Sequence, residues 1–293
     1  MFANIVKYSI CRFGVDSHLP GCMMKRLIVC ADDFALNEAA SRGIAALASA
    51  GRISATSAMV LSPRWAGDAA LLQSVRGQID VGLHLDWTSS LARTTGHGVS
   101  LQGAMLRALL GGFNLRAARA VVERQLDAFE AVWEKPPDHI DGHQHVQQFA
   151  GIREALVAAV QHRYPPKDRP YLRLSAGLAT DKTLKTKIIA GLGAPALATL
   201  AKAAGIDCAP ALSGIYDFTG GASHYADLMA LWLQQAREGS VVMCHPATRA
   251  ETSDEIGAAR TWEYAYLSSD AFVQALNLSG AVVARGAGIN FRA

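Results

Sequence analysis

Short apolar runs alternate with amphipathic segments along most of the chain. Runs rich in Val, Ile and Leu predict strands over residues 26–31, 53–61, 79–85, 139–141, 171–174, 241–244 and 281–284. Apolar positions at helical spacing predict helices over residues 37–50, 65–75, 115–133, 149–162, 184–204, 225–237 and 268–276. The segment 184–204 is expected to break near residues 191–195, where Gly and Pro interrupt the pattern.

This alternation of strand and helix indicates the fold class. Repeated βα units joined by short turns are typical of parallel strands in an α/β protein. A count of about seven strands favours a single-domain, incomplete β/α barrel over a doubly wound sheet. The active site of such a barrel lies at the C-terminal ends of its strands. Residues 86–112 are long for a connection and are expected to form a lid or a binding loop.

Polar residues stand where several predicted strands end. Asp32 and Asp33 follow the first strand, His84 lies near the end of the third, and His245 follows the sixth. Because these ends converge in a parallel α/β fold, the four side chains are expected at one site. Each has a simpler structural interpretation. The aspartates could cap the next helix, His84 could be a satisfied core residue, and His245 could cap its strand.

Residues 139–145 concentrate three of the nine histidines and one carboxylate. Positions 139, 141, 143 and 145 share one face wherever the chain is extended, although Gly142 predicts a turn near His143. Converging His, Asp and His side chains suit Zn²⁺ or another divalent ion that keeps a position open for water. The alternative is a polar loop without a ligand.

Two further side chains have open interpretations. Trp87 could stack on a sugar, although aromatic residues are more often part of the core. Arg173 could pair with a catalytic carboxylate or lie on the surface. Both are kept as candidates for holding the substrate or supporting the site.

Composition and charge exclude several classes of protein. Hydrophobic residues make up 51% of the 293 residues, so the chain can bury a sizeable core. A formal net charge of +3 gives no strong electrostatic case for nucleic acid or an anionic membrane. No apolar stretch is long enough to cross a bilayer, so no transmembrane segment is expected. The sequence does not decide whether the chain forms a homodimer.

The cysteines and the N-terminal segment bear on location and domain boundaries. Five cysteines without a Cys-x-x-Cys pair favour a reducing, cytoplasmic location. The first 23 residues carry scattered charges, and Met23-Met24 precede the first strand. We therefore expect residues 1–23 to be a loose extension or a mis-assigned start, and residues 24–293 to form the barrel domain.

Four motifs in order carry a resemblance to a known family. They are Ala-Asp-Asp-Phe (31–34), Gly-Leu-His-Leu (82–85), His-Ile-Asp-Gly-His-Gln-His-Val (139–146) and Cys-His-Pro (244–246). Together they resemble the YdjC-like carbohydrate deacetylases, which include the ChbG and HpnK types. The resemblance implies a distorted β/α barrel that removes acetyl groups from N-acetylated sugars with one divalent metal ion. It departs at Ala35, Gln147 and Ala247, which concern the substrate rather than the ligands.

The resemblance also implies roles for individual residues. Asp33, His84 and His143 would be the metal ligands, and Asp32 would be the general base. The residues themselves suggest that His245, or alternatively His145, protonates the leaving amine. Asp141 is expected to orient a histidine from behind the ligand set.

The sequence therefore predicts a metal-dependent amide hydrolase. Its substrate would be an N-acetylated sugar or oligosaccharide, or a glycolipid that carries one. The metal is left open between Mg²⁺ and Zn²⁺, because mixed nitrogen and oxygen ligands accept either. The alternatives are another barrel metal hydrolase, such as a phosphoesterase, and a non-catalytic protein that binds metal or sugar.

Overall fold

A computed structural model describes residues 24–178 and 184–291. The expectation for residues 1–23 lies outside the described residues. The strands are β1 (Lys25–Phe34), β2 (Ala55–Ala58), β3 (Asp80–Leu85), β4 (His139–Gly142), β5 (Tyr171–Arg173), β6 (Cys208–Ala209), β7 (Leu212–Ser213), β8 (Val241–Cys244) and β9 (Ala281–Val283). The α-helices are α1 (Glu38–Ser49), α2 (Trp65–Asp68), α3 (Ser90–Thr94), α4 (Leu101–Leu109), α5 (Leu115–Trp133), α6 (Ile152–Arg163), α7 (Leu184–Gly191), α8 (Ala194–Ala203), α9 (Gly221–Gln235), α10 (Gly257–Ser268) and α11 (Asp270–Leu278).

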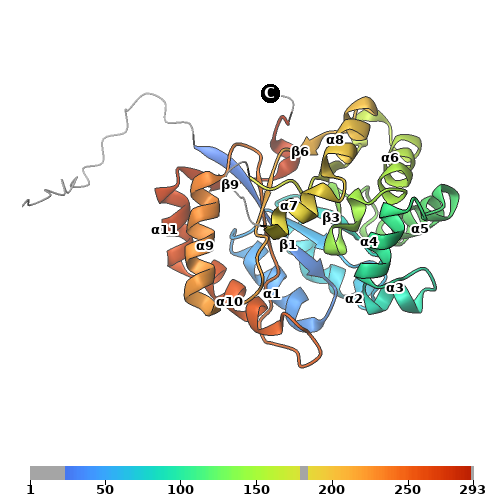
Figure 1. Ribbon diagram of the computed structural model, residues 1–293. Coiled ribbons are helices and arrows are strands. Elements are labelled where there is room, and N and C mark those ends of the chain that lie inside the picture. The colour runs from blue at the N-terminus through green and yellow to red at the C-terminus, as the bar shows by residue number, and fades with distance from the viewer. Residues whose placement is uncertain (1–23, 179–183, 292–293) are drawn as a thin grey trace, which may run out of the picture.

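The strands form one parallel sheet that nearly closes into a barrel. Its order is β6-β5-β4-β3-β2-β1-β8-β7, and β9 pairs with the start of β1. One seam, between β6 and β7, is not sealed by a strand pairing among the described residues. The prediction of an incomplete parallel-strand β/α barrel is confirmed. Figure 1 shows α9, α10 and α11 on one side of the sheet and α5 and α6 on the other.

The alternation along β1 explains how this strand serves two hydrophobic layers. Leu27 and Val29 belong to the large core beneath the helices, whereas Ile28 and Cys30 belong to a smaller cluster inside the barrel. Successive residues of a strand face opposite sides, so a strand that is covered on both sides must be apolar throughout. Accordingly, β1 is buried from Leu27 onward, and β2 and β3 are buried along their whole length.

The helix α5 follows the prediction for residues 115–133. Val122, Leu126, Phe129 and Trp133 recur at helical spacing and face the core. The side chain of Asn114 caps the first turn by accepting a hydrogen bond from the backbone of Ala117, at 3.0 Å. The predicted break in residues 184–204 is also confirmed, because α7 and α8 meet at Gly193.

Three predictions about the elements were incomplete. The strands β6 and β7 have two residues each, too short to show a period. The helix α10 was not predicted, and the expected binding loop of residues 86–112 contains α3 and α4. The helix predicted over residues 65–75 begins as α2 and continues as a 3₁₀ helix, Ala69–Val75.

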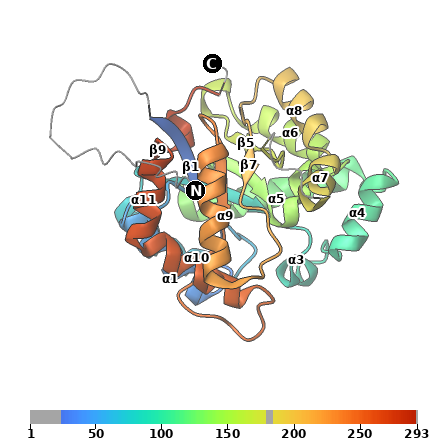
Figure 2. The ribbon, with the colours of Figure 1, turned by 60° about the vertical axis from the view of Figure 1, so that its left-hand side comes forward.

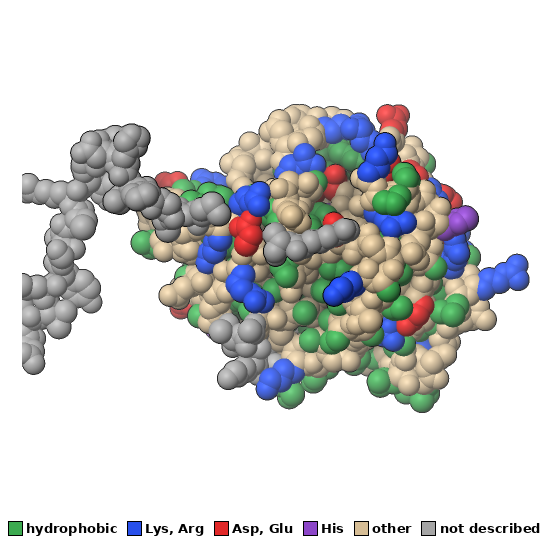
Figure 3. Space-filling model, turned by 90° about the horizontal axis from the view of Figure 1, so that it is seen from above, with side chains coloured by type: hydrophobic (Ala, Val, Ile, Leu, Met, Phe, Trp, Pro, Cys, Tyr) green, Lys and Arg blue, Asp and Glu red, His purple; other side chains and the backbone are tan. Residues whose placement is uncertain are grey.

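The surface carries no single dominant charge on the face that Figure 3 shows. Basic, acidic and hydrophobic side chains are interspersed over it. Among residues 24–178 and 184–291, no helix is both long and apolar enough to cross a membrane.

Candidate active site

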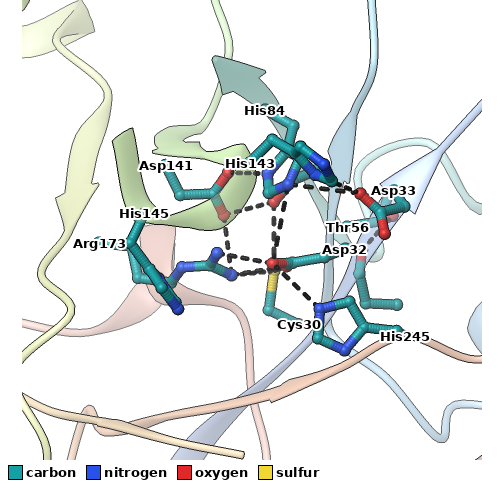
Figure 4. A network of polar contacts seen from close by, with 12 residues as sticks. Cys30, Asp32, Asp33, Thr56, His84, Asp141, His143, His145, Arg173 and His245 are labelled. Carbon is teal, nitrogen blue, oxygen red and sulfur yellow. Dashed lines mark hydrogen bonds and ion pairs between the residues drawn. The ribbon is translucent and has the colours of Figure 1, made fainter. Parts of the chain in front are cut away.

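A network of charged and imidazole side chains lies at the C-terminal ends of the central strands (Figure 4). The side chains come from β1, β3, β4, β5 and the segments that follow β4 and β8. They are Asp32, Asp33, His84, Asp141, His143, Arg173 and His245. The structure thus brings together seven of the nine residues that the sequence singled out.

A β-bulge in β1 directs two adjacent carboxylates to this network. Ala31 pairs with Thr56 and Phe34 with Ala58, so β1 holds one extra residue between these pairings. Asp33 adopts a left-handed backbone with φ +68°. A regular strand would point Asp32 and Asp33 to opposite faces, whereas a bulge turns the extra residue back. Both carboxylates consequently reach His84.

Asp32 forms a bidentate ion pair with Arg173. The guanidinium donates from Nη1 to Asp32 Oδ1 at 2.6 Å and from Nη2 to Oδ2 at 2.7 Å. Both side chains are buried, so the pair is shielded from solvent. Bidentate pairing of this kind fixes the plane of the carboxylate. Of the two interpretations of Arg173, the surface position is wrong, because the side chain is buried and pairs with the carboxylate of Asp32.

His84 is oriented by Asp141. Its Nδ1 donates to Asp141 Oδ1 at 2.6 Å, which leaves Nε2 directed toward Asp33. Although burial alone would lower the pKa of His84, Asp141 and then Asp32 raise it to about 9. Asp141 in turn accepts from Ser57 Oγ at 2.5 Å and from Arg173 Nη1 at 2.9 Å. Burial would raise the pKa of Asp141, but Arg173 and His84 hold it well below its usual range.

One set of ligand atoms fits a divalent metal ion. Asp33 Oδ1 lies 3.5 Å from His84 Nε2 and 3.2 Å from His143 Nδ1. Atoms bound to one ion at about 2.0–2.2 Å stand roughly 3.0–3.4 Å apart, close to these separations. The ligand atoms of the three side chains all lie within 4.8 Å of one another.

Two other groups in the network have a similar composition but fit a metal ion less well. Cys30, His139 and Asp141 are buried together, yet the Arg173 guanidinium lies 3.7 Å from Cys30 Sγ and 2.9 Å from Asp141. The third group, Asp32, His84 and Asp141, uses a carboxylate that Arg173 already binds through both oxygens. Arg173 contacts ligand atoms of both of these groups, whereas the arginine beside Asp33 contacts only its Oδ2 and leaves Oδ1 to the two histidines. The set around Asp33 is therefore the best candidate.

Arg260, in α10, was not identified from the sequence. Its Nη2 donates to Asp33 Oδ2 at 2.7 Å and its Nε donates to Asp254 at 2.6 Å. Burial would raise the pKa of Asp33, but Arg260 and then His143 hold it well below its usual range. Because Arg260 occupies one carboxylate oxygen, only Oδ1 of Asp33 faces the two histidines.

Replacing Arg260 by Met is expected to destabilise the fold. Arg260 is only 3% exposed, and its loss leaves the buried Asp33 without its principal countercharge. Removing one partner of a buried ion pair costs about 3–5 kcal/mol. Denaturant unfolding of the metal-free protein measures the change. Arg249→Met is the control, because Arg249 is 56% exposed and pairs with Glu251 at the surface. Equal stability of both variants would contradict the prediction.

His245 lies on the other side of Asp32 from the histidine–aspartate set. Its Nε2 is 4.0 Å from Asp32 Oδ2, and its Nδ1 is 3.9 Å from Glu263 Oε1. The backbone N–H of His245 donates to the other oxygen of Glu263, and Tyr216 donates to Oε1 at 2.7 Å. The ring of Phe218 meets the imidazole edge to face, with centroids 5.4 Å apart. Glu263 thus anchors the segment that carries His245.

The remaining two predicted residues differ in their outcomes. His145 and Gln144 both adopt a left-handed backbone conformation, and His145 Nδ1 lies 2.9 Å from Ser175 Oγ. Burial and the nearby Arg173 lower the pKa of His145 to about 3, so its ring is neutral near pH 7. Trp87 is 2% exposed and packs in the core with an edge-on contact to His97. A ring buried in this way offers no face for stacking on a sugar.

Arg260 and Glu263 were missed because the helix that carries both was missed. They stand three residues apart on the buried face of α10, together with Ala259 and Leu267. The spacing of these four positions was the available signal for a helix. Two charged residues on an otherwise buried face would then have indicated buried partners.

Fold and site together define an α/β barrel with one carboxylate–imidazole cluster at the strand ends. A family model described as YdjC-like protein matches residues 26–278. The chain therefore belongs to the YdjC-like family.

Similar proteins include curated relatives and a solved structure. A chitooligosaccharide deacetylase of Serratia marcescens is 28% identical over 231 residues, which are 77% of this chain and 83% of that protein. One of Yersinia pestis (strain Pestoides F) is 31% identical over 150 residues, 49% of this chain. That match spans only 59% of the Yersinia protein's length.

The solved structure shares the fold. It is an Enterococcus faecalis V583 protein named for cellobiose-phosphate cleavage, with a TM-score of 0.66 at 20% identity. The alignment covers 89% of this chain and 97% of that protein.

Proposed function

We propose that this protein is a metal-dependent carbohydrate deacetylase that hydrolyses the N-acetyl group of a sugar. The observation that carries the proposal is that the two adjacent carboxylates at the end of β1 have different partners. Asp33 faces two imidazoles as a ligand set, while the adjacent Asp32 is held apart from that set by Arg173. Amide hydrolysis with metal needs both a ligand set and a separate base.

Asp33, His84 and His143 would hold the ion. A divalent ion bound there supplies Lewis acidity that polarises the acetyl carbonyl and makes a water molecule more acidic. Asp141 fixes the tautomer of His84 so that Nε2 is available as a ligand. Mixed carboxylate and imidazole ligands accept Mg²⁺, Zn²⁺ and other divalent ions, so the metal is proposed only as one divalent ion.

Asp32 would take the proton of the attacking water. Arg173 holds the carboxylate in one orientation, with Oδ2 4.0 Å from both His84 Nε2 and His245 Nε2. His245 would then donate a proton to the departing amine. His145 suits this step less well, because its ring is neutral near pH 7.

The names of the relatives support a sugar substrate. The Serratia and Yersinia proteins are chitooligosaccharide deacetylases, so an N-acetylated oligosaccharide is the first substrate to test. A lipid-linked N-acetylated sugar belongs to the same chemical class. We propose a cytoplasmic location, because Cys30 and Cys244 are buried free thiols.

Acetate release tests the proposal. Purified protein reconstituted with Mg²⁺ or Zn²⁺ is incubated with N-acetylated mono- and oligosaccharides, and free acetate and amine are measured. Equal amounts of both products are expected, and chelator should abolish them. Failure with every N-acetylated sugar, or release of phosphate from sugar phosphates instead, would contradict the proposal.

Replacing His245 by Ala is expected to lower kcat for the sugar amide by about a hundredfold while the metal stays bound. An amine is a poor leaving group without a proton, whereas a nitrophenolate leaves unprotonated. Turnover of 4-nitrophenyl acetate should therefore fall much less. Loss of metal would make His245 a ligand instead. Unchanged amide turnover, together with a loss in His145→Ala, would move the acid to His145.

A further inference from the structure

An exposed apolar face lies on the elements that follow β3 and β5. Its leucine and isoleucine side chains are between 49% and 75% exposed. They come from α4 and the residue that follows it, from the start of α5, and from α7. The residues of this α4–α7 face are Leu106, Leu109, Leu110, Leu115, Leu184 and Ile188.

The two parts of this face are neighbours in space. Leu109 and Ala108 at the end of α4 line one groove together with Gly191 and Leu192 at the end of α7. Figure 2 shows α4 and α7 on the same side of the molecule. Leu106 and Leu110 stand one helical turn apart, as do Leu184 and Ile188, so each part presents a continuous stripe. An apolar face of this extent marks an interaction surface.

The charges beside the face are mostly basic, although Glu154 lines a groove together with Leu115 and Arg116. Residues 87–122 contain four arginines and no Asp or Glu, and residues 184–206 contain three lysines and no Asp or Glu. The whole chain has a formal net charge of only +3, so the basic excess is local. Arg107, Arg116 and Lys187 are exposed beside the apolar side chains. This local excess of basic residues fits an anionic partner, which the net charge of the whole chain does not indicate.

We propose that the α4–α7 face docks on an anionic lipid bilayer surface. Amphipathic helices that combine exposed leucines with basic residues insert their apolar side chains at the headgroup boundary. Arginine and lysine then meet the negative surface potential of the lipid. The proposal is independent of the chemistry at the metal-ligand set.

A second copy of the chain fits this face less well. A two-fold contact pairs a patch with the same patch on the partner, so the basic residues of both copies would be brought together. Like charges placed across an interface oppose association. A bilayer offers both a negative layer and an apolar layer, which match the two kinds of side chain.

Docking in this way would bring the polar cluster near the lipid. The helix α4 follows β3, which carries His84, and α7 follows β5, which carries Arg173. Both elements therefore project from the end of the barrel where the cluster lies.

Vesicle sedimentation tests the proposal. The full chain is mixed with sucrose-loaded vesicles of phosphatidylcholine alone or with added phosphatidylglycerol. Sedimentation is expected only with the anionic vesicles, and it should weaken at about 0.5 M salt because screening shortens the reach of the charges. The double variant Leu109→Glu, Leu110→Glu should bind at least about tenfold more weakly.

Leu278→Glu is the matched control. Leu278 is 90% exposed on α11, outside the α4–α7 face, so this variant should sediment like the original chain. All three substituted leucines are at the surface, and thermal unfolding should confirm that the variants fold equally. No sedimentation with anionic vesicles, or equal sedimentation of the double variant, overturns the proposal. A dimer that the double variant dissociates, without vesicle binding, would assign the face to a second copy instead.

Discussion

Replacing Asp32 by Asn is expected to lower turnover by about a hundredfold or more while the metal stays bound. An amide cannot accept the proton of the attacking water, whereas Asp33, His84 and His143 keep their ligand atoms. The variant should lose activity against both the sugar amide and 4-nitrophenyl acetate, because water attack precedes departure of either leaving group. This pattern separates Asp32 from His245. Rates are measured under metal saturation.

The control for Asp32→Asn must separate chemistry from stability. The substitution also weakens the buried pair with Arg173, so some loss of stability is expected. Asp80→Asn weakens another ion pair of a buried aspartate, in which Arg285, 33% exposed, places its Nε 2.7 Å from Asp80 Oδ1. This pair lies at the start of β3 and thus at the opposite end of the barrel. It should reduce stability without reducing turnover per folded molecule. Normal turnover in Asp32→Asn would remove this residue from the mechanism.

The fold was largely predictable because most of its strands and helices show their own period of hydrophobic residues in the sequence. The run at residues 26–31 and the amphipathic α5 each show a clear period and a clear end. The two-residue strands β6 and β7 carry no period at all, because they are defined by pairing with β5 and β8. A strand of two residues is too short for its sequence to indicate which distant strand it pairs with.

The site was predictable in its residue types but not in its geometry. Strand ends predicted that Asp32, Asp33 and His84 meet, since parallel strands place these ends at one rim. The bulge in β1 was not predictable from periodicity, and it is the feature that turns both carboxylates to the same side. Arg260 lies 227 residues from Asp33 and approaches it only through the packing of α10. Long-range ion pairs of this kind follow from the tertiary structure.

Trp87 had two open interpretations, stacking on a sugar or packing in the core. Its ring is buried in the core. Aromatic rings bury large apolar areas, and the sequence does not distinguish a ring packed beneath a rim from one that lines it.

His143→Ala is expected to abolish tight binding of the divalent ion and, with it, nearly all acetate release. The substitution removes one of three ligand atoms and leaves only Asp33 and His84, which is too few for a stable site. Metal content after dialysis measures the loss. His162→Ala is the control, because His162 is exposed at the end of α6 and should leave metal content unchanged. Full occupancy in His143→Ala would exclude this ligand set.

Metal binding by the unaltered chain should also release protons. In the metal-free protein the pKa of His84 is raised to about 9, so its imidazole is protonated near pH 7.5. An ion can bind Nε2 only after that proton leaves, so affinity should rise by about tenfold per pH unit below pH 9 and level off above it. Titration calorimetry in two buffers of different ionisation enthalpy counts the protons. About one proton per ion is expected near pH 7.5. An affinity for the ion that does not change between pH 7 and 9 would show that binding does not require deprotonation of His84.

Asp141→Asn tests the cause of the raised pKa of His84. Because Asp141 is the first charge that raises this pKa, the variant should release fewer protons per bound ion, while the ligand atoms of Asp33 and His143 remain in place.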